Sequence, residues 1–286
     1  MITPDDKLDA LRRYLVDMRS VLVAFSGGVD SSFLLWVAAD TLGPRCTALT
    51  TVSAAVPEHD EAAARRLAAD LGIHHLVIST DELASPDYAR NPTNRCYFCK
   101  DHLFQTCERE ARRLGIGVIV DGANVDDLSD HRHGLQAAAN AGVRHPLIEA
   151  GLRKDDVRTL SRRVGLETWD RPSSPCLASR IPYGMTITPE RLGQVAHGER
   201  FLRERGFKEL RLRHHDQIAR IEIPIADLPR LLEPDLRAAI VSRLRQIGFA
   251  YVTVDLAGFR SGSLNEVTLS PPESHERAPA RSNSSA

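Results

Sequence analysis

The feature that most constrains this chain is a short apolar run, Val21–Phe25, that leads directly into the segment Ser26–Ser32, with the sequence SGGVDSS. Five consecutive apolar residues are typical of a strand that is buried on both faces of a parallel sheet. Residues 33–42 are again mainly apolar and predict a helix. A buried strand, a glycine turn and a helix in this order predict an α/β fold with its ligand site at the carboxyl end of the strand.

The same alternation of strands and helices continues downstream. Further strands are predicted at 48–52, 76–78 and 118–120, and helices at 57–71 and 100–114. Strands that alternate with helices indicate a parallel sheet covered by helices on both faces. We therefore expect residues 1–185 to form one α/β domain that carries the glycine-rich loop.

The pattern changes at about residue 186. Helices are predicted at 189–205 and 233–247, and strands at 209–214, 219–225 and 251–256. They predict a smaller α+β module over residues 186–270, and we expect this module to contribute to substrate binding and oligomerisation. Residues 271–286 are rich in Pro, Ser, Glu and Arg without apolar periodicity, which predicts a disordered tail.

Composition argues against several classes of protein. The chain has 37 Lys and Arg against 38 Asp and Glu, so its net charge of −1 gives no general attraction to nucleic acid. No apolar run approaches the ~18 residues of a membrane-spanning helix, and the N-terminus does not resemble a secretory signal. We therefore expect a cytoplasmic protein, in which the five cysteines are free, catalytic or metal-bound rather than paired in disulfides.

The segment SGGVDSS has the properties of an anion-binding loop. Gly27 and Gly28 allow a tight turn that brings backbone N–H groups against a phosphate, and the following helix directs its positive N-terminal end to the same place. Asp30 is expected either to cap this helix or to help organise Mg²⁺. The alternative interpretation is an ordinary N-capped helix after a glycine turn. The segment is not a Walker A loop, because no Gly-Lys-Ser/Thr follows.

This arrangement resembles the PP-loop ATP pyrophosphatases, whose fold is that of the adenine nucleotide alpha hydrolases. The resemblance implies that ATP is cleaved between its α and β phosphates, that a substrate oxygen is adenylated, and that a nucleophile then displaces AMP. Two further segments contribute to the resemblance, DGANVDD at residues 121–127 and the stretch around Lys154. A polar turn and a solvated lysine are the alternatives for these two. The residues that the resemblance assigns to ATP are Ser26, Gly27, Gly28, Val29, Asp30, Ser31, Ser32, Ser53, Gly122, Asn124, Asp126 and Lys154.

The cysteines fall into two groups. Cys96 and Cys99 form a C-x-x-C that is predicted to lie immediately before a helix, where the helix terminus and neighbouring basic residues would lower the pKa of a thiol. Cys176 lies in a polar, proline-containing loop between two arginines. Cys46 and Cys107 are interpreted as packing residues. A redox pair and an incidental spacing are the alternatives for the C-x-x-C.

Five segments together are similar to the LarE family of sulfur transferases: SGGVDSS, RCYFCK, WDRPSSPCLASRIPYG, LRLRHHDQIARIEIP and DLAGFRSGSLNE. The similarity covers roughly residues 5–268. It implies that the carboxylates of a pyridinium-3,5-dicarboxylate mononucleotide are adenylated and converted to thiocarboxylates, in the biosynthesis of the nickel-pincer nucleotide of lactate racemase. It also implies a catalytic role for Cys176.

The resemblance leaves two sources for the sulfur. In one branch of the family the cysteine at the position of Cys176 gives up its own sulfur. In another branch, a C-x-x-C and that cysteine bind an iron–sulfur cluster that carries an additional sulfide. Cys96, Cys99 and Cys176 suit a 4Fe-4S cluster with one open iron better than zinc, for which no fourth ligand is evident. We expect such a cluster here, with sulfide or a cysteine desulfurase as the sulfur source.

Substrate binding is expected from arginines and one aromatic residue. Arg211 and Arg213 alternate on one face of a predicted strand, so both could reach one phosphate, and the family-like segments add Arg180, Arg260 and Tyr97. A solvated face is the alternative for the arginines, and simple packing for Tyr97. The expected partners are a small-molecule nucleotide and further copies of the chain in a homo-oligomer, without a membrane or nucleic acid. The alternative function is that of a tRNA thiolase of the same superfamily.

Overall fold

The computed structural model describes residues 2–128, 133–172, 175–260 and 263. The predicted tail, residues 271–286, lies outside these residues. A four-stranded sheet with the order β3-β2-β1-β4 forms the centre of the larger part of the chain. All its pairings are parallel, as predicted. Its strands are β1 (Val21–Ala24), β2 (Cys46–Val52), β3 (His74–Ser79) and β4 (Val118–Asp121).

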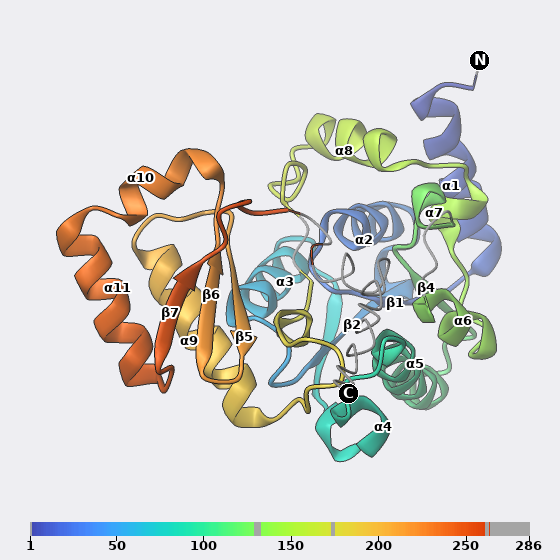
Figure 1. Cartoon of the computed structure of the whole chain (residues 1–286). Helices are drawn as coiled ribbons and strands as arrows, with labels where there is room; N and C mark the ends of the chain where they lie inside the picture. The colour runs from blue at the N-terminus through green and yellow to red at the C-terminus, as the bar shows by residue number, and fades with distance from the viewer. Residues whose placement is uncertain (1, 129–132, 173–174, 261–262, 264–286) are drawn as a thin grey trace, which may run out of the picture.

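Helices cover both faces of this sheet (Figure 1). Successive β1 residues point in opposite directions: Val21 and Val23 pack into one apolar cluster, and Leu22 and Ala24 into another. The first cluster is completed by α1 (Pro4–Met18), α2 (Val29–Leu42), α3 (Glu58–Asp70), α7 (Pro146–Glu149) and α8 (Lys154–Arg163), and the second by α5 (Arg95–Leu114) and α6 (His133–Asn140). The fold is therefore the α/β fold expected from the sequence.

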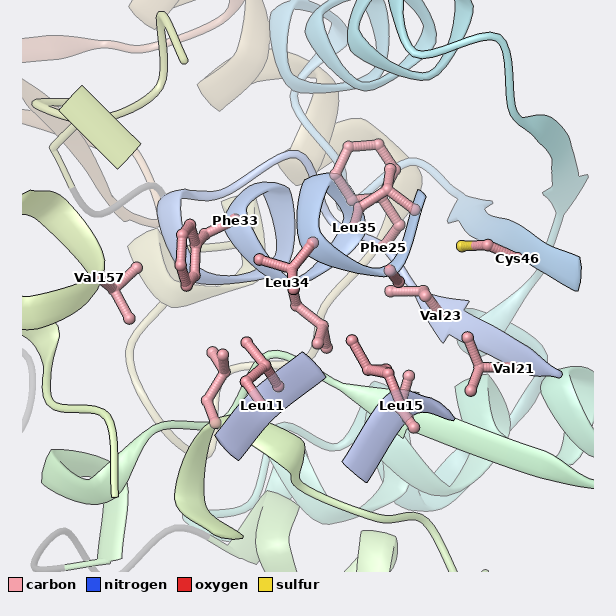
Figure 2. Packing of buried hydrophobic residues seen from close by; sticks show 14 of the residues in the cluster. Leu11, Leu15, Val21, Val23, Phe25, Phe33, Leu34, Leu35, Cys46 and Val157 are labelled. Atoms are coloured by element: carbon pink, nitrogen blue, oxygen red, sulfur yellow. The ribbon is translucent and has the colours of Figure 1, made fainter. Parts of the chain in front are cut away.

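The first cluster is the larger core of the molecule. Leu11 and Leu15 of α1 lie against Leu34 of α2, and Val23 of β1 closes the same core (Figure 2). Burial of such side chains stabilises the fold by roughly 1.5–3 kcal/mol each. Cys46 belongs to this cluster and Cys107 to the one on the opposite face, and burial raises the pKa of each thiol to about 12. The prediction that these two cysteines pack in the core is confirmed.

The C-terminal part contains a second, three-stranded sheet. The strands β5 (Arg211–His215), β6 (Ile218–Glu222) and β7 (Tyr251–Val254) pair in this order, antiparallel between β5 and β6 and parallel between β6 and β7. This sheet and its helices share a separate apolar core. Its helices are α9 (Pro189–Glu204), α10 (Leu228–Leu231) and α11 (Pro234–Ile247). The mixed α+β character predicted for this part is therefore present.

Short helical segments complete the chain: α4 (Pro86–Ala89) and the 3₁₀ turns η1 (Gly43–Arg45), η2 (Glu82–Ala84), η3 (Val125–Leu128), η4 (Leu177–Arg180) and η5 (Ile225–Asp227). Two predicted boundaries differ in a way that matters for the site. β2 begins earlier, at Cys46, and α5 begins at Arg95 rather than near residue 100. The C-x-x-C therefore lies inside the first turns of α5 and not before the helix. In the part of the chain that the structure describes, no helix is long and apolar enough to cross a membrane.

Candidate active site

The glycine-rich loop connects β1 to α2 at the carboxyl end of the parallel sheet. Gly27 has a φ of +74°, and a Cβ atom on it would lie 3.2 Å from Cβ of Ala64 on α3, so both conformation and space favour glycine here. Gly28 is the N-cap residue of α2, and no side chain caps this helix. Asp30 lies within the first turn and does not cap it. The structure therefore shows an uncapped helix N-terminus behind the loop, which is the arrangement that binds phosphates.

Gly122 follows β4 and allows the loop and the neighbouring strand to approach closely. Ala24 of β1 pairs with Asp121 of β4, so the segments that follow these two strands lie side by side. A Cβ atom at Gly122 would lie only 2.7 Å from the backbone N of Ser31 and 2.9 Å from its Cα. Gly122 is therefore a packing requirement of the phosphate loop, in addition to the expected ATP contact.

Three further predicted ATP residues meet at Asp30. The Nζ of Lys154, at the start of α8, pairs with the Asp30 carboxylate, and Asn124 Nδ2 lies 3.3 Å from Asp30 Oδ1. The backbone N of Lys154 donates to Asp126 Oδ2 at 2.8 Å. Ser53 follows β2 at the same edge of the sheet, where its Oγ accepts the N–H of Ala55 at 3.3 Å. The structure thus brings together residues 30, 124, 126 and 154, which are distant in the sequence.

A titratable pair lies below this group at the end of β4. His145 Nδ1 is 2.6 Å from Asp121 Oδ1, and both side chains are largely buried. The hydrogen bond to Asp121 raises the pKa of His145 despite the opposing effect of burial. Burial acts to raise the pKa of Asp121, but the hydrogen bond from His145 and the charge of Lys100 lower it overall. The pair therefore fixes a carboxylate directly before Gly122.

The cysteine loop and the C-x-x-C meet at an apolar cluster. Cys99 and Cys176 both pack against a cluster that contains Tyr88 and Leu177, and the backbone N of Leu177 donates to the carbonyl of Ala55 at 2.8 Å. Burial, with the nearby Cys176 in second place, raises the pKa of the Cys99 thiol to about 12. The expectation of a lowered pKa for this cysteine is therefore wrong: desolvation outweighs the helix terminus and Lys100.

The expected ligands of the iron–sulfur cluster are the thiols of Cys96, Cys99 and Cys176. Cys96 is exposed, whereas Cys99 and Cys176 are partly buried, so the three thiols share a neighbourhood but not one environment. Among the described residues, no three or more His, Cys, Asp or Glu side chains form a group that could hold a metal ion. As arranged in this structure, the three thiols do not form a ready-made cluster site.

A strap of residues 181–187 is fastened to the start of α5 by Asn91. This fully buried residue has a φ of +56° and donates from Nδ2 to the carbonyl oxygens of Ile181, Pro182 and Met185 at 3.2, 2.7 and 3.1 Å. Its own Oδ1 accepts a hydrogen bond from Arg95, the first residue of α5. Asn91 therefore fixes the C-x-x-C relative to the strap that follows Cys176.

Arg171 connects the cysteine loop to the phosphate loop. Its Nη1 donates to the carbonyl of Gly27 at 3.0 Å, and its Nη2 pairs with Asp60 of α3 at 2.7 Å. The backbone carbonyl of Arg171 accepts from Arg158 of α8 at 3.0 Å. Arg171 therefore joins the phosphate loop to α3 and to the segment that precedes Cys176.

Two predicted substrate arginines have internal partners instead. The side chain of Arg180 is fully buried, pairs with Glu199 of α9 and donates to the carbonyl oxygens of Pro175 and Cys176 at 2.6 and 3.2 Å. Arg213 is buried and donates to both carboxylate oxygens of Glu222 at 3.0 and 2.9 Å. Neither guanidinium is accessible to a ligand in this structure, so the expectation that Arg211 and Arg213 both reach one phosphate is not met by their positions.

The remaining predicted substrate residues are more accessible. The guanidinium of Arg211 lies 5.1 Å from the centre of the Phe259 ring, and burial lowers its pKa to about 10. Arg260, the next residue after Phe259, is partly exposed and donates to the carbonyl of Gly258. Tyr97 packs against the core under α5, and its hydroxyl accepts a hydrogen bond from Asn140 at 3.1 Å. Packing is thus at least part of the role of Tyr97.

Comparisons with known proteins agree with this geometry. The family model for asparagine synthase matches residues 8–99, which include the phosphate loop. An uncharacterised protein of Synechocystis is 41% identical over 92% of this chain and 98% of its own length. Pyridinium-3,5-bisthiocarboxylic acid mononucleotide synthase of Lactiplantibacillus plantarum is 37% identical over 93% of this chain and 96% of its own length. The chain belongs to the LarE family.

It is accordingly an ATP-dependent sulfur transferase of the PP-loop type. A tRNA-specific 2-thiouridylase of Thermus thermophilus is also similar, with 30% identity, but over only 55% of this chain and 53% of its own length. The shared region of such a relative is too short to identify the whole protein. The LarE relationship, by contrast, extends over both sheets.

Three residues of this LarE chain were not identified from the sequence. Arg171 was noted only as a neighbour of Cys176, and Asn91 and Tyr88 were not considered. The one local signal was an Asn followed by Pro at 91–92, because Asn adopts positive φ more readily than most residues. Tyr88 and Arg171 act through contacts with distant segments, for which a single sequence carries no signal.

Proposed function

We propose that this chain adenylates the carboxylates of a pyridinium-3,5-dicarboxylate mononucleotide and converts them to thiocarboxylates, releasing AMP and pyrophosphate. The product would be the compound named in the Lactiplantibacillus relative, and its expected use is the nickel-pincer nucleotide of lactate racemase. The observation that carries the proposal is the bond from Arg171 to the carbonyl of Gly27, which links the phosphate loop to the Cys176 segment. Activation and sulfur delivery then occur at neighbouring places.

We assign the adenylation step to the carboxyl end of the parallel sheet. The uncapped N–H groups of α2 and the cation of Lys154 would bind the phosphates and stabilise the departing pyrophosphate. Carboxylates are ligands that Mg²⁺ prefers alongside phosphate oxygens, so Asp30 and Asp126 would hold the ion together with the phosphates. When bound, Mg²⁺ would neutralise charge on the leaving group.

We assign the sulfur-transfer step to Cys99 and Cys176 and the apolar cluster against which they pack. A sulfur anion would attack the acyl carbon, and the bond to AMP would break with its electron pair on the phosphate oxygen. The sulfur would come from one of two sources. It would be sulfide on a 4Fe-4S cluster that Cys96, Cys99 and Cys176 would hold, supplied by free sulfide or by a cysteine desulfurase with a thiol reductant. Otherwise it would be the sulfur of Cys176 itself, whose Cβ–S bond would then break with loss of the α-proton and leave dehydroalanine.

Iron and sulfide analysis of anaerobically purified protein separates these two routes. Bound iron and sulfide would support the cluster. Iron-free protein that transfers one sulfur atom per chain, with loss of that atom from Cys176, would exclude the cluster as the sulfur source.

We assign substrate binding to Arg211, Arg260 and Tyr97. The cation of Arg211 beside Phe259 is suited to a phosphate group. Arg180 and Arg213 would act indirectly, because they hold the Cys176 segment: Arg213 Nη1 donates to the carbonyl of Ser179 at 2.7 Å. Replacing Arg211 by Ala should raise the KM for the mononucleotide far more than the KM for ATP.

The five free thiols suit a reducing, cytoplasmic setting, and we propose a homo-oligomer built through the C-terminal module. The second candidate function is tRNA thiolation, which the Thermus relative favours. Binding of tRNA at physiological salt would support it.

The decisive test is ATP–pyrophosphate exchange. Exchange that depends on pyridinium-3,5-dicarboxylate mononucleotide and not on tRNA is the expected result. Exchange that depends on tRNA would replace the proposed function by the second candidate.

A further inference from the structure

Tyr88 carries a buried hydroxyl group that the reaction described above does not use. This residue of α4 is only 1% exposed, and its phenol oxygen has no hydrogen-bond partner in the described part of the chain. Buried polar groups are nearly always hydrogen-bonded, so a buried hydroxyl without a protein partner is open to a water molecule, an ion or a ligand.

The ring of Tyr88 is held firmly. It lies in the apolar cluster with Ala55, Leu177 and Ile181, and its backbone carbonyl accepts the N–H of Asn91 at 2.9 Å. Asn91 in turn fastens the strap 181–187 through three side-chain hydrogen bonds. The hydroxyl therefore cannot swing out to solvent without opening this cluster.

Four neighbouring groups influence the pKa of Tyr88 through their charges: Cys176, Cys99, Glu82 and Arg95. Two of them are already engaged, because Glu82 accepts a hydrogen bond from Thr80 at 2.9 Å and Arg95 donates to Asn91. Burial, reinforced by the two cysteines and Glu82, raises the pKa of Tyr88. The phenol is therefore a neutral donor, and the sulfur atoms of Cys99 and Cys176, which pack against the same apolar cluster, are acceptors beside it.

We infer that the Tyr88 hydroxyl donates a hydrogen bond to the sulfur being transferred, while that sulfur carries negative charge between Cys99 and Cys176. This inference rests on the proposed function. In the transfer step the sulfur forms its bond to the acyl carbon, the acyl–oxygen bond to AMP breaks, and Tyr88 keeps its proton throughout. The hydroxyl orients the anion and compensates for its removal from water. When the sulfur is that of Cys176, the same hydroxyl acts on its thiolate, and the Cβ–S bond breaks afterwards with loss of the α-proton.

A hydroxyl with this function differs measurably from a structural one. A structural hydrogen bond would be lost in Tyr88→Phe, and the protein would become less stable. A hydroxyl without a partner in the resting protein can be removed without that loss. Adenylation is assigned to the phosphate loop, which Arg171 joins to the Cys176 segment. The rate of adenylation should therefore not depend on Tyr88.

The experiment compares Tyr88→Phe with wild type and with Tyr14→Phe, which removes a phenol oxygen from α1. It measures the melting temperature, ATP–pyrophosphate exchange, and the kcat and KM of thiocarboxylate formation. For Tyr88→Phe we expect an unchanged or higher melting temperature, exchange within twofold of wild type, an unchanged KM, and a kcat for sulfur transfer at least tenfold lower. Tyr14→Phe should retain both activities.

Two results would overturn the inference alone: sulfur transfer by Tyr88→Phe within twofold of wild type, or a fall in exchange parallel to the fall in transfer. A melting temperature several degrees lower would show that the hydroxyl is structural and would also overturn it. Wild-type protein that exchanges no pyrophosphate and forms no thiocarboxylate would instead overturn the proposed function, and the inference with it.

Discussion

Arg180 Nε lies 2.7 Å from Oε1 of Glu199, and neither side chain exposes any surface to solvent. The pair joins η4, directly after Cys176, to α9 of the C-terminal module. Glu199 also accepts the backbone N–H of Leu212 at 3.1 Å and pairs with Arg203 at 2.7 Å. Burial acts to raise the pKa of Glu199, but the charge and hydrogen bond of Arg180 lower it overall. One buried carboxylate therefore connects the segment after Cys176 with α9 and β5 of the C-terminal module.

Replacing Glu199 by Gln should lower the free energy of unfolding by about 3–5 kcal/mol, because it leaves the buried Arg180 cation without its partner. Urea denaturation followed by circular dichroism measures this. Asp5→Asn is the matched control, since Asp5 is 65% exposed and its solvent-screened pair with Arg163 should contribute little. Equal losses in the two variants would contradict the connecting role of Glu199.

Gly122→Ala should damage the phosphate loop, because the added Cβ atom would lie 2.7 Å from the backbone N of Ser31. We expect ATP–pyrophosphate exchange to fall roughly 10²-fold, the effect of a small displacement of reacting groups. Gly117→Ala is the control, as nothing lies within 4 Å of its added Cβ atom. An exchange rate in Gly122→Ala equal to that of the control would show that the loop tolerates the displacement.

The strand and loop predictions succeeded because they depend on local patterns. The run Val21–Phe25 is apolar at every position since β1 is covered on both faces, and Gly27 is needed by its own backbone conformation. Requirements of this kind determine which residue types occur next to one another, so a single sequence is enough to recognise them.

The errors concern side chains whose partners are distant in the sequence. Arg213 was expected to face a phosphate, but Glu222 on the paired strand β6 takes up its guanidinium. Cys99 was expected to be an acidic thiol at a helix terminus, but α5 begins at Arg95 and the thiol is buried against Cys176. Charge and spacing do not reveal which carboxylate or cluster tertiary packing will place beside a residue.

Lys154→Met should lower the kcat of adenylation by about 10²–10³-fold, the usual effect of removing one stabilising group from a developing anion. The substitution also leaves Asp30 without its lysine partner, so we expect the KM for ATP to change as well. Initial rates of mononucleotide-dependent pyrophosphate exchange measure both constants. Lys7→Met is the control, because it breaks a different lysine pair to α8, the one between Lys7 and Asp156, away from the loop. It should leave both constants within twofold of wild type. A similar loss in both variants would assign the effect to α8 as a whole.

The His145–Asp121 pair should make stability depend on pH. The pKa of His145 is raised in the folded state, so its contribution is complete below the unfolded value of about 6.5 and is lost as pH rises through the folded pKa. The pKa of Asp121 is lowered, so its contribution is present above about 3.9 and is lost as pH falls through the folded pKa. Melting temperatures of His145→Gln should therefore differ most from wild type at about pH 5–6, and the difference should shrink as pH rises through the folded pKa of His145. A difference that does not change with pH would show that the pair contributes no linked protonation.

The most direct test of the central claim is a single-turnover reaction of the purified protein with ATP, Mg²⁺, sulfide and pyridinium-3,5-dicarboxylate mononucleotide, followed by mass spectrometry. The proposed function predicts that oxygen is replaced by sulfur in the carboxylates of the mononucleotide, with one AMP formed for each sulfur transferred. AMP formation without sulfur in the mononucleotide, or sulfur transferred to tRNA instead, would contradict it.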